Sequence, residues 1–220
     1  MPVMEGVRPG IRGTITIAVI LIAAGIGLLV ANARGGGDTR HTAPGLRADL
    51  LPGDLEGSRA PAIRLPDARG GVLDSTRLAG RPYLVTFVYT HCVDLCPIIG
   101  SEIADALRQL GPRARDVTVL AVSVDPRRDS PAAARRWLRE RGLGPEAHYL
   151  LGSRAQLTPV WRDWYVVSRG ETLADPTTHA AGVWLVDAAG RLRGRWSGGE
   201  SIAPGDIAHD LRTLLDTRSA

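Results

Sequence analysis

The stretch YLVTFVYTHCVDLCP, residues 83–97, decides how the chain is expected to fold. Its first seven residues are mostly β-branched, aromatic or otherwise apolar, which predicts a strand buried inside a sheet. A helix is predicted over residues 97–110, because apolar side chains recur there at helical spacing: Ile99, Ile103, Leu107 and Leu110. Cys92 and Cys96 therefore lie where a buried strand ends and a helix begins.

Strands and helices alternate through the rest of the chain. A second central strand is predicted at residues 117–124, and Ser130-Pro131 is typical of a capped helix start, here for a helix that runs to about Arg141. The other expected elements are a hairpin at 62–65 and 71–73, a helix capped by Ser153, strands at 183–186 and 192–196, and a last helix from Ala203-Pro204. This order predicts an α/β fold in which helices cover both faces of a mixed sheet.

The N-terminal part predicts contact with a membrane. Residues 14–31 form a run of 18 residues without a charge, close to the length that spans a bilayer. The length of the run favours an anchor, whereas Ala31-Asn32-Ala33 resembles a cleavage site and favours a signal peptide. We therefore expect an N-terminal membrane anchor or signal segment at 1–33, a flexible linker at 34–55 and one folded domain at 56–220.

Composition excludes several classes of protein. A hydrophobic fraction of 44% in 220 residues supports a real core and argues against a disordered chain. The net charge is only +4, and no basic stripe is interleaved with aromatic residues, so binding to nucleic acid is not predicted. Two cysteines are too few for a disulfide scaffold in a domain of this size, so they are expected to be a redox or metal-binding pair.

The position of the two cysteines has chemical consequences. Open α/β sheets place their sites at the carboxyl ends of strands, and a helix N-terminus carries positive partial charge that stabilises a thiolate. Cys92 and Cys96 are therefore expected to be more acidic than free cysteines. Thiolates are soft ligands that select Cu(I) over hard cations, and two of them leave a site that needs one more donor.

Residues 83–97 resemble the motif of the Sco/SenC copper chaperones, which help to assemble the dinuclear copper centre of cytochrome c oxidase. VDPRRDSP at residues 124–131 and Thr178-His179, before the strand at 183–186, resemble two further segments of that family. The resemblance covers residues 56–220 and implies a thioredoxin-like fold with a copper ion held by Cys92, Cys96 and His179. Val93 departs from the family pattern, which often has proline at this position.

The same resemblance implies a location and a partner. The domain is expected on the extracytoplasmic, periplasmic-equivalent side of a cell membrane, tethered by a single N-terminal helix. The expected partner is the copper-recipient subunit of cytochrome c oxidase. Redox state and copper loading would be linked, because Cu(I) needs both cysteines reduced.

Other interpretations of the same residues stay open. A membrane-anchored thiol–disulfide oxidoreductase would need both cysteines but neither copper nor His179, so His179→Ala separates the two functions. Cys92 and Cys96 could instead form a structural disulfide, although closing so short a loop adds little stability. His179 could be an ordinary, partly buried histidine.

Three carboxylates near the motif are not assigned as ligands. Asp94 is expected to be exposed or to cap the following helix, with tuning of the thiolates as the alternative. Asp125 and Asp129 are expected to serve turn and cap chemistry, with a loop beside the site as the alternative. His91 is expected to point away from the site, because neighbours on an extended segment face opposite sides.

Overall fold

The computed structural model describes residues 45–49, 51, 55–166, 181–197 and 202–217. The chain divides into two compact units, Met1–Arg40 and His41–Ala220, and every described residue belongs to the second. The predicted membrane segment at 14–31 lies outside the described residues. Within the described part, no helix has both the length and the apolar character needed to cross a bilayer.

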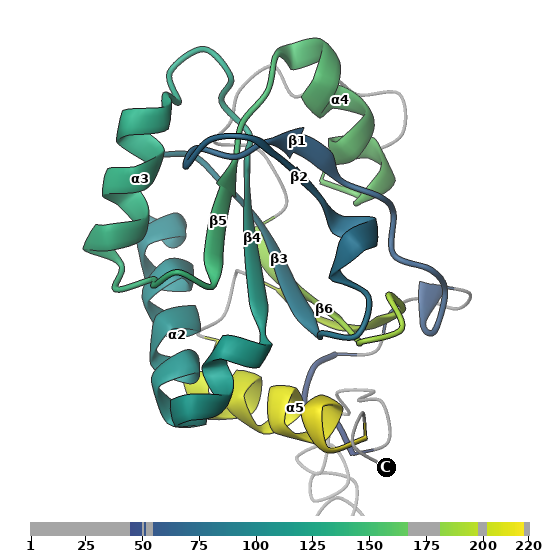
Figure 1. The fold of residues 1–220 in the computed structure, drawn as a ribbon. Coiled ribbons are helices and arrows are strands. Elements are labelled where there is room, and N and C mark those ends of the chain that lie inside the picture. Colours follow the sequence, from purple (N-terminus) through teal and green to yellow (C-terminus); the bar gives the residue numbers. More distant parts are fainter. Residues whose placement is uncertain (1–44, 50, 52–54, 167–180, 198–201, 218–220) are drawn as a thin grey trace, which may run out of the picture. The chain divides into compact units, whose positions relative to one another are not determined.

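Five strands form one sheet in the order β5-β4-β3-β6-β7 (Figure 1). The two central ones are β3 (Tyr83–Val88) and β4 (Thr118–Ser123), flanked by β5 (Ala147–Leu150), β6 (Gly182–Val186) and β7 (Leu192–Ser197). The first three along the chain are parallel, whereas β6 runs antiparallel to β3 and β7 antiparallel to β6. The predicted mixed α/β class is confirmed.

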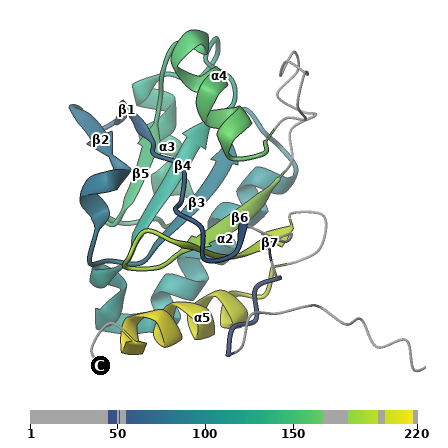
Figure 2. The ribbon, with the colours of Figure 1, turned by 90° about the vertical axis from the view of Figure 1, so that its right-hand side faces the viewer.

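Four α-helices flank this sheet in the described part: α2 (Leu95–Leu110), α3 (Pro131–Glu140), α4 (Arg154–Asp163) and α5 (Pro204–Thr217). All four are predicted from the sequence, and Ser130 and Ser153 cap α3 and α4 as expected. α2 packs against α5, whereas α4 and α5 lie at opposite ends of the sheet in both views (Figures 1 and 2).

The core lies between the central strands and the helices. Every residue of β3 and β4 is buried, as expected for strands inside a sheet covered on both faces. The predicted apolar face of α2, from Ile99 to Leu110, is also buried. Gly100 lets α3 approach α2 closely, because a Cβ atom on it would lie 2.8 Å from Cη2 of Trp137.

Two parts of the fold differ from the predicted elements. β5 was not expected, since it has only four residues and includes the polar His148. The predicted hairpin exists but is displaced by one or two residues, to β1 (Arg64–Pro66) and β2 (Val72–Asp74). These two strands pair only with each other and form a separate two-stranded sheet.

The described residues of the predicted linker pack against the folded domain. Leu46, Ala48 and Leu51 are buried, and the backbone N–H groups of Arg47 and Ala48 donate to the buried Asp210 carboxylate at 2.8–2.9 Å. The packed structure therefore begins before residue 56, the expected start of the domain.

Candidate metal and redox site

The two cysteines lie at the carboxyl end of β3, where the chain turns into α2. The Cys92 N–H donates to the carbonyl oxygen of Tyr89 at 3.2 Å, and the Cys96 N–H donates to the Cys92 sulfur at 3.4 Å. The Cys92 sulfur thus accepts a hydrogen bond from the first turn of α2, where a capping side chain usually acts. Both cysteines are free thiols, so the structure contains no disulfide between them.

Asp94 occupies the N-cap position of α2 but does not cap it. Its side chain makes no capping hydrogen bond and is exposed to solvent. The expectation of an exposed carboxylate is confirmed, and the expectation of a cap is wrong. The physical reason is that the Cys92 sulfur already accepts the N–H group of Cys96.

The two thiols are buried to different extents. Cys92 is partly buried, whereas Cys96 is only 2% exposed and belongs to the hydrophobic core. Burial raises the pKa of the Cys96 thiol well above its usual range, and its hydrogen bond with Cys92 raises it further. The prediction of an acidic Cys96 is therefore wrong for the metal-free protein, because loss of solvation outweighs the helix terminus.

Tyr89 forms part of the surroundings of Cys92. Its side chain is 8% exposed, and its pKa is raised to about 12, first by burial and then by the neighbouring Cys92. The phenol therefore stays neutral at physiological pH and can act as a hydrogen-bond donor beside the cysteine. The sequence does not single out Tyr89, since an aromatic residue at the end of a buried strand is most simply a core residue.

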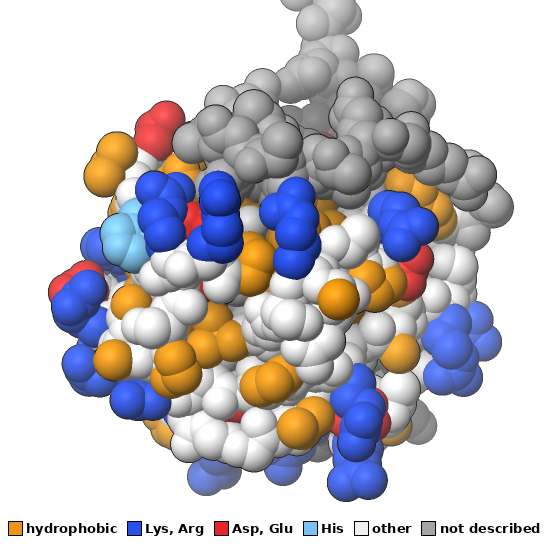
Figure 3. Space-filling model, turned by 90° about the horizontal axis from the view of Figure 1, so that it is seen from above, with side chains coloured by type: hydrophobic (Ala, Val, Ile, Leu, Met, Phe, Trp, Pro, Cys, Tyr) orange, Lys and Arg blue, Asp and Glu red, His pale blue; other side chains and the backbone are white. Residues whose placement is uncertain are grey.

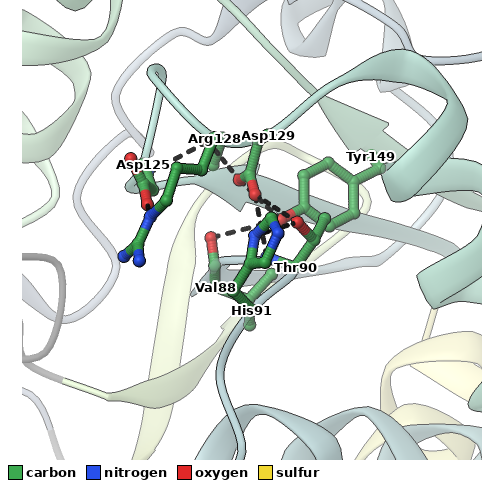
Figure 4. A network of polar contacts seen from close by, with 8 residues as sticks. Val88, Thr90, His91, Asp125, Arg128, Asp129 and Tyr149 are labelled. Carbon is green, nitrogen blue, oxygen red and sulfur yellow. Dashed lines mark hydrogen bonds and ion pairs between the residues drawn. The ribbon is translucent and has the colours of Figure 1, made fainter.

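A carboxylate from the neighbouring strand's loop reaches the segment that leads into the cysteines (Figure 4). Asp129 Oδ1 accepts hydrogen bonds from the backbone N–H and the hydroxyl of Thr90, at 2.8 and 2.7 Å. Its Oδ2 accepts from the hydroxyls of Ser123 and Tyr149, at 2.6 and 2.9 Å. The preferred turn-and-cap role is wrong for Asp129, and the alternative of a loop beside the site is confirmed.

Asp125 follows the expected turn chemistry more closely. Its carbonyl oxygen accepts the N–H groups of Arg128 and Asp129, and its buried carboxylate pairs with the Arg128 guanidinium. Arg128 in turn lies near enough to Tyr89 for its charge to lower the pKa of the phenol slightly. A positive group therefore stands at the edge of the site.

His91 is exposed, and its Nδ1 lies 3.0 Å from the hydroxyl oxygen of Thr90. Because that hydroxyl already donates its proton to Asp129, it can only accept from His91, so Nδ1 must carry a proton. The ring is thereby joined to the same network as Thr90 (Figure 4).

Side chains beside the cysteines are unusually exposed for apolar residues. Val93, between the two cysteines, is 95% exposed, and Ile98 in the first turn of α2 is 49% exposed. On the face in Figure 3, hydrophobic side chains are scattered among polar ones, and several arginines stand in a row beside the grey residues. Single apolar side chains are common on protein surfaces, so these residues form no docking patch by themselves.

The third predicted ligand, His179, lies outside the described residues. Among the residues that are described, no cluster of three His, Cys, Asp or Glu side chains could hold a metal ion by itself. Two thiols nevertheless suit copper chemically, because their deprotonated forms are soft sulfur ligands. The described site therefore supplies two donors of the predicted three.

The fold and the site together define a class: a thioredoxin-like α/β domain with two free cysteines at the junction of its central strand and a helix. The SCO1/SenC family matches residues 58–216 of this chain. The chain belongs to the SCO1/SenC family.

Individual relatives agree with this assignment. The mitochondrial SCO2 homolog of Bos taurus is 31% identical over 164 residues, which cover 72% of this chain and 58% of that protein. A SCO2-like protein of Rickettsia conorii is 27% identical over 135 residues, covering 59% of this chain and 64% of the relative. The chain thus spans about three fifths of the length of these curated relatives.

A solved structure shows the same fold. ScoI of Bradyrhizobium japonicum, solved with copper bound, superposes with a TM-score of 0.60 at 30% sequence identity. The match covers 71% of this chain and 99% of that one.

Proposed function

We propose that this chain is a copper chaperone that binds copper through Cys92, Cys96 and His179. It would deliver the metal to the dinuclear copper site of cytochrome c oxidase. The observation that carries the proposal is the pair of free thiols at the start of α2, where the Cys96 N–H donates to the Cys92 sulfur, in a chain of the SCO1/SenC family. The relative from Bradyrhizobium japonicum, whose structure contains copper, supports the choice of metal.

The donor set fits Cu(I) in particular. Both thiols must lose their protons to bind the ion. The positive charge of the bound ion would stabilise the buried Cys96 thiolate, which burial disfavours in the metal-free protein. Two thiolates and one imidazole would give the ion a soft, low-coordinate site. Cys92 keeps the site accessible because it is only partly buried.

The topology of the sheet supports His179 as the third ligand. β6 pairs antiparallel with β3, with Val183 opposite Thr86, and the Thr86 hydroxyl donates to the Gly182 carbonyl oxygen at 2.9 Å. The chain therefore enters β6 at the same edge of the sheet where β3 leaves for the cysteines. His179 precedes Gly182 by three residues, which span at most about 11 Å.

We further propose that residues 14–31 attach the domain to a membrane, with the domain on the extracytoplasmic side. The uncharged run of 18 residues is long enough to span a bilayer. The recipient of the copper would then be the copper-binding subunit of the oxidase.

A competition titration tests the copper site. The full chain in detergent is reduced without oxygen and titrated with Cu(I) against a chelator, beside His179→Ala and the double Cys92→Ser/Cys96→Ser variant. We expect one tight equivalent, lost in the double variant and weakened in His179→Ala. The matched control is His209→Ala, which removes a histidine on α5. This helix packs against the end of α2 that lies away from the cysteines, where Arg212 donates to the carbonyl oxygen of Gln109.

The outcomes separate the parts of the proposal. Equal Cu(I) affinity in the wild type and the double cysteine variant would refute the cysteine site. Equal affinity in His179→Ala and His209→Ala would remove His179 from the ligand set and leave the thiols in place.

One observation also favours a thiol–disulfide oxidoreductase as the second candidate. The Cys96 N–H donates to the Cys92 sulfur at 3.4 Å, so the two cysteines are neighbours at the start of α2, and joining them in a disulfide would release two protons and two electrons. Reduction of a target disulfide would proceed by attack of one thiolate and a mixed disulfide. This activity should survive His179→Ala, whereas tight copper binding should not.

A further inference from the structure

Asp129 is a saturated hydrogen-bond acceptor. A carboxylate offers about four acceptor positions, and here four donors occupy them: the N–H and hydroxyl of Thr90 and the hydroxyls of Ser123 and Tyr149. These donors come from the segment before the cysteines, from the end of β4 and from β5 (Figure 4). One side chain therefore joins three parts of the fold at a single point.

Asp129 is itself firmly held. Its N–H donates to the carbonyl oxygen of Asp125 at 3.0 Å, and the next residue, Ser130, caps α3. Tyr149 is fully buried, and Ser123 is also fully buried at the end of a central strand. The carboxylate thus has a fixed place relative to the sheet.

The hydrogen bonds that order the cysteine segment locally come from the segment itself. Cys92 N–H bonds to Tyr89, and Cys96 N–H bonds to the Cys92 sulfur, so these contacts move together with the segment. The bonds from Thr90 to Asp129 are different, since they join residues 39 positions apart in the chain. They tie the segment to a rigid reference, two residues before Cys92.

We propose that Asp129 is a positioning residue that holds Cys92 at the separation from Cys96 needed for both sulfurs to bind one copper ion. The proposal rests on the proposed function. Asp129 does not touch the metal, and it acts through Thr90 and the backbone that leads into Cys92. Groups that orient metal ligands in this way typically contribute about 10–100-fold to metal affinity.

The test uses Thr90→Val, which keeps the shape of the side chain but removes the hydroxyl that donates to Asp129. Thr90→Ser is the rescue variant, because it restores the hydroxyl. Asp129→Asn is the second probe, since an amide nitrogen cannot accept the hydrogen bonds that one carboxylate oxygen accepts. Ser153→Ala is the matched control, because it removes the cap of another helix, α4, and Ser153 has no part in the Asp129 network.

Each full-length variant in detergent is measured for Cu(I) affinity against a chelator and for the thiolate-to-copper absorption bands of its Cu(II) form. We expect the affinity of Thr90→Val and Asp129→Asn to fall about 10–100-fold, with shifted absorption bands. Thr90→Ser and Ser153→Ala should keep the affinity and the bands of the wild type. A loss in Ser153→Ala equal to that in Thr90→Val would overturn the proposal, since the effect would then be general loss of structure.

A copper-free measurement separates this proposal from the proposed function. Exchange of the Cys92 amide hydrogen in the reduced, metal-free protein should be at least about tenfold faster in Thr90→Val than in Thr90→Ser. If the wild type does not bind Cu(I), the chaperone function fails and this exchange rate still decides the role of Asp129. The Thr90 N–H still donates to Asp129 in Thr90→Val, so the refuting result is that Thr90→Val and Asp129→Asn both keep the copper affinity and the exchange rate of the wild type.

Discussion

The stability of the reduced, metal-free protein should fall as the pH rises through about 9, because of Cys96. In the unfolded chain this thiol ionises at its ordinary pKa of 9.0, whereas burial and the Cys92 hydrogen bond raise its pKa in the folded state. The folded protein therefore holds one proton that the unfolded chain releases. By linkage, this stabilisation is complete below the unfolded pKa and is lost as the pH rises above it.

The loss in the free energy of unfolding can be calculated from the release of one proton, that of Cys96. The limiting slope is about 1.4 kcal/mol per pH unit, and integration from an unfolded pKa of 9.0 gives losses of about 0.4 kcal/mol at pH 9.0 and about 0.8 kcal/mol at pH 9.5. Tyr83, Tyr89 and Tyr149 also have raised pKa values, and they add to the loss as the pH approaches 10. Most of their contribution cancels when variants are compared with the wild type, because burial is the main cause of each tyrosine shift.

The assay is urea unfolding at pH 7.5 and pH 9.5, followed by tryptophan fluorescence, with a reductant and a metal chelator present. Cys96→Ser should lose about 0.8 kcal/mol less than the wild type between the two pH values. Cys92→Ser is the control, because it removes the other thiol and leaves Cys96 buried, so most of the loss should persist. Equal losses in the wild type and Cys96→Ser would refute the reasoning, since the helix terminus would then fully offset the burial.

Three further predictions can be checked by similar methods. Gly100→Ala should lower the free energy of unfolding by about 1–3 kcal/mol in urea titrations, because its Cβ atom would overlap Trp137. Asp210→Ala should cost about 2–4 kcal/mol in the same assay, since the N–H groups of Arg47 and Ala48 would lose their acceptor. The apparent Cu(I) affinity should rise by about tenfold per pH unit between pH 6 and pH 8 for each thiol proton displaced, and a flat profile would contradict binding through Cys96.

The central fold follows from local patterns. The continuous apolar runs at β3 and β4 and the helical spacing of Ile99 and Ile103 are signals within a few residues of each other, and each prediction is confirmed. β5 has no such signal, because four residues are too short to show a period. Its place in the sheet depends on pairing with β4, which the local sequence does not express.

The site also has some features that the local sequence predicts and others that it does not. The cysteine pair is a local motif, so its position at the strand–helix junction could be predicted. The burial of Cys96 had a readable signal, since Cys96 lies on the same face of α2 as Ile99 and Ile103. The contact between Thr90 and Asp129 has only a weak signal in the sequence. Both residues follow parallel strands that are neighbours in the sheet, and the carboxyl ends of such strands meet at one edge.

The unequal burial of the two thiols bears on how a bound ion would leave. In the proposed copper site, an incoming ligand from a recipient protein would reach Cys92 first, because Cys96 is only 2% exposed and lies within the core. Once Cys92 is displaced, Cys96 remains as a buried thiolate that burial disfavours, so taking up a proton would help it to release the metal. On this proposal, the same burial that makes Cys96 a weak acid would favour release in one order, with Cys92 exchanged first and Cys96 last.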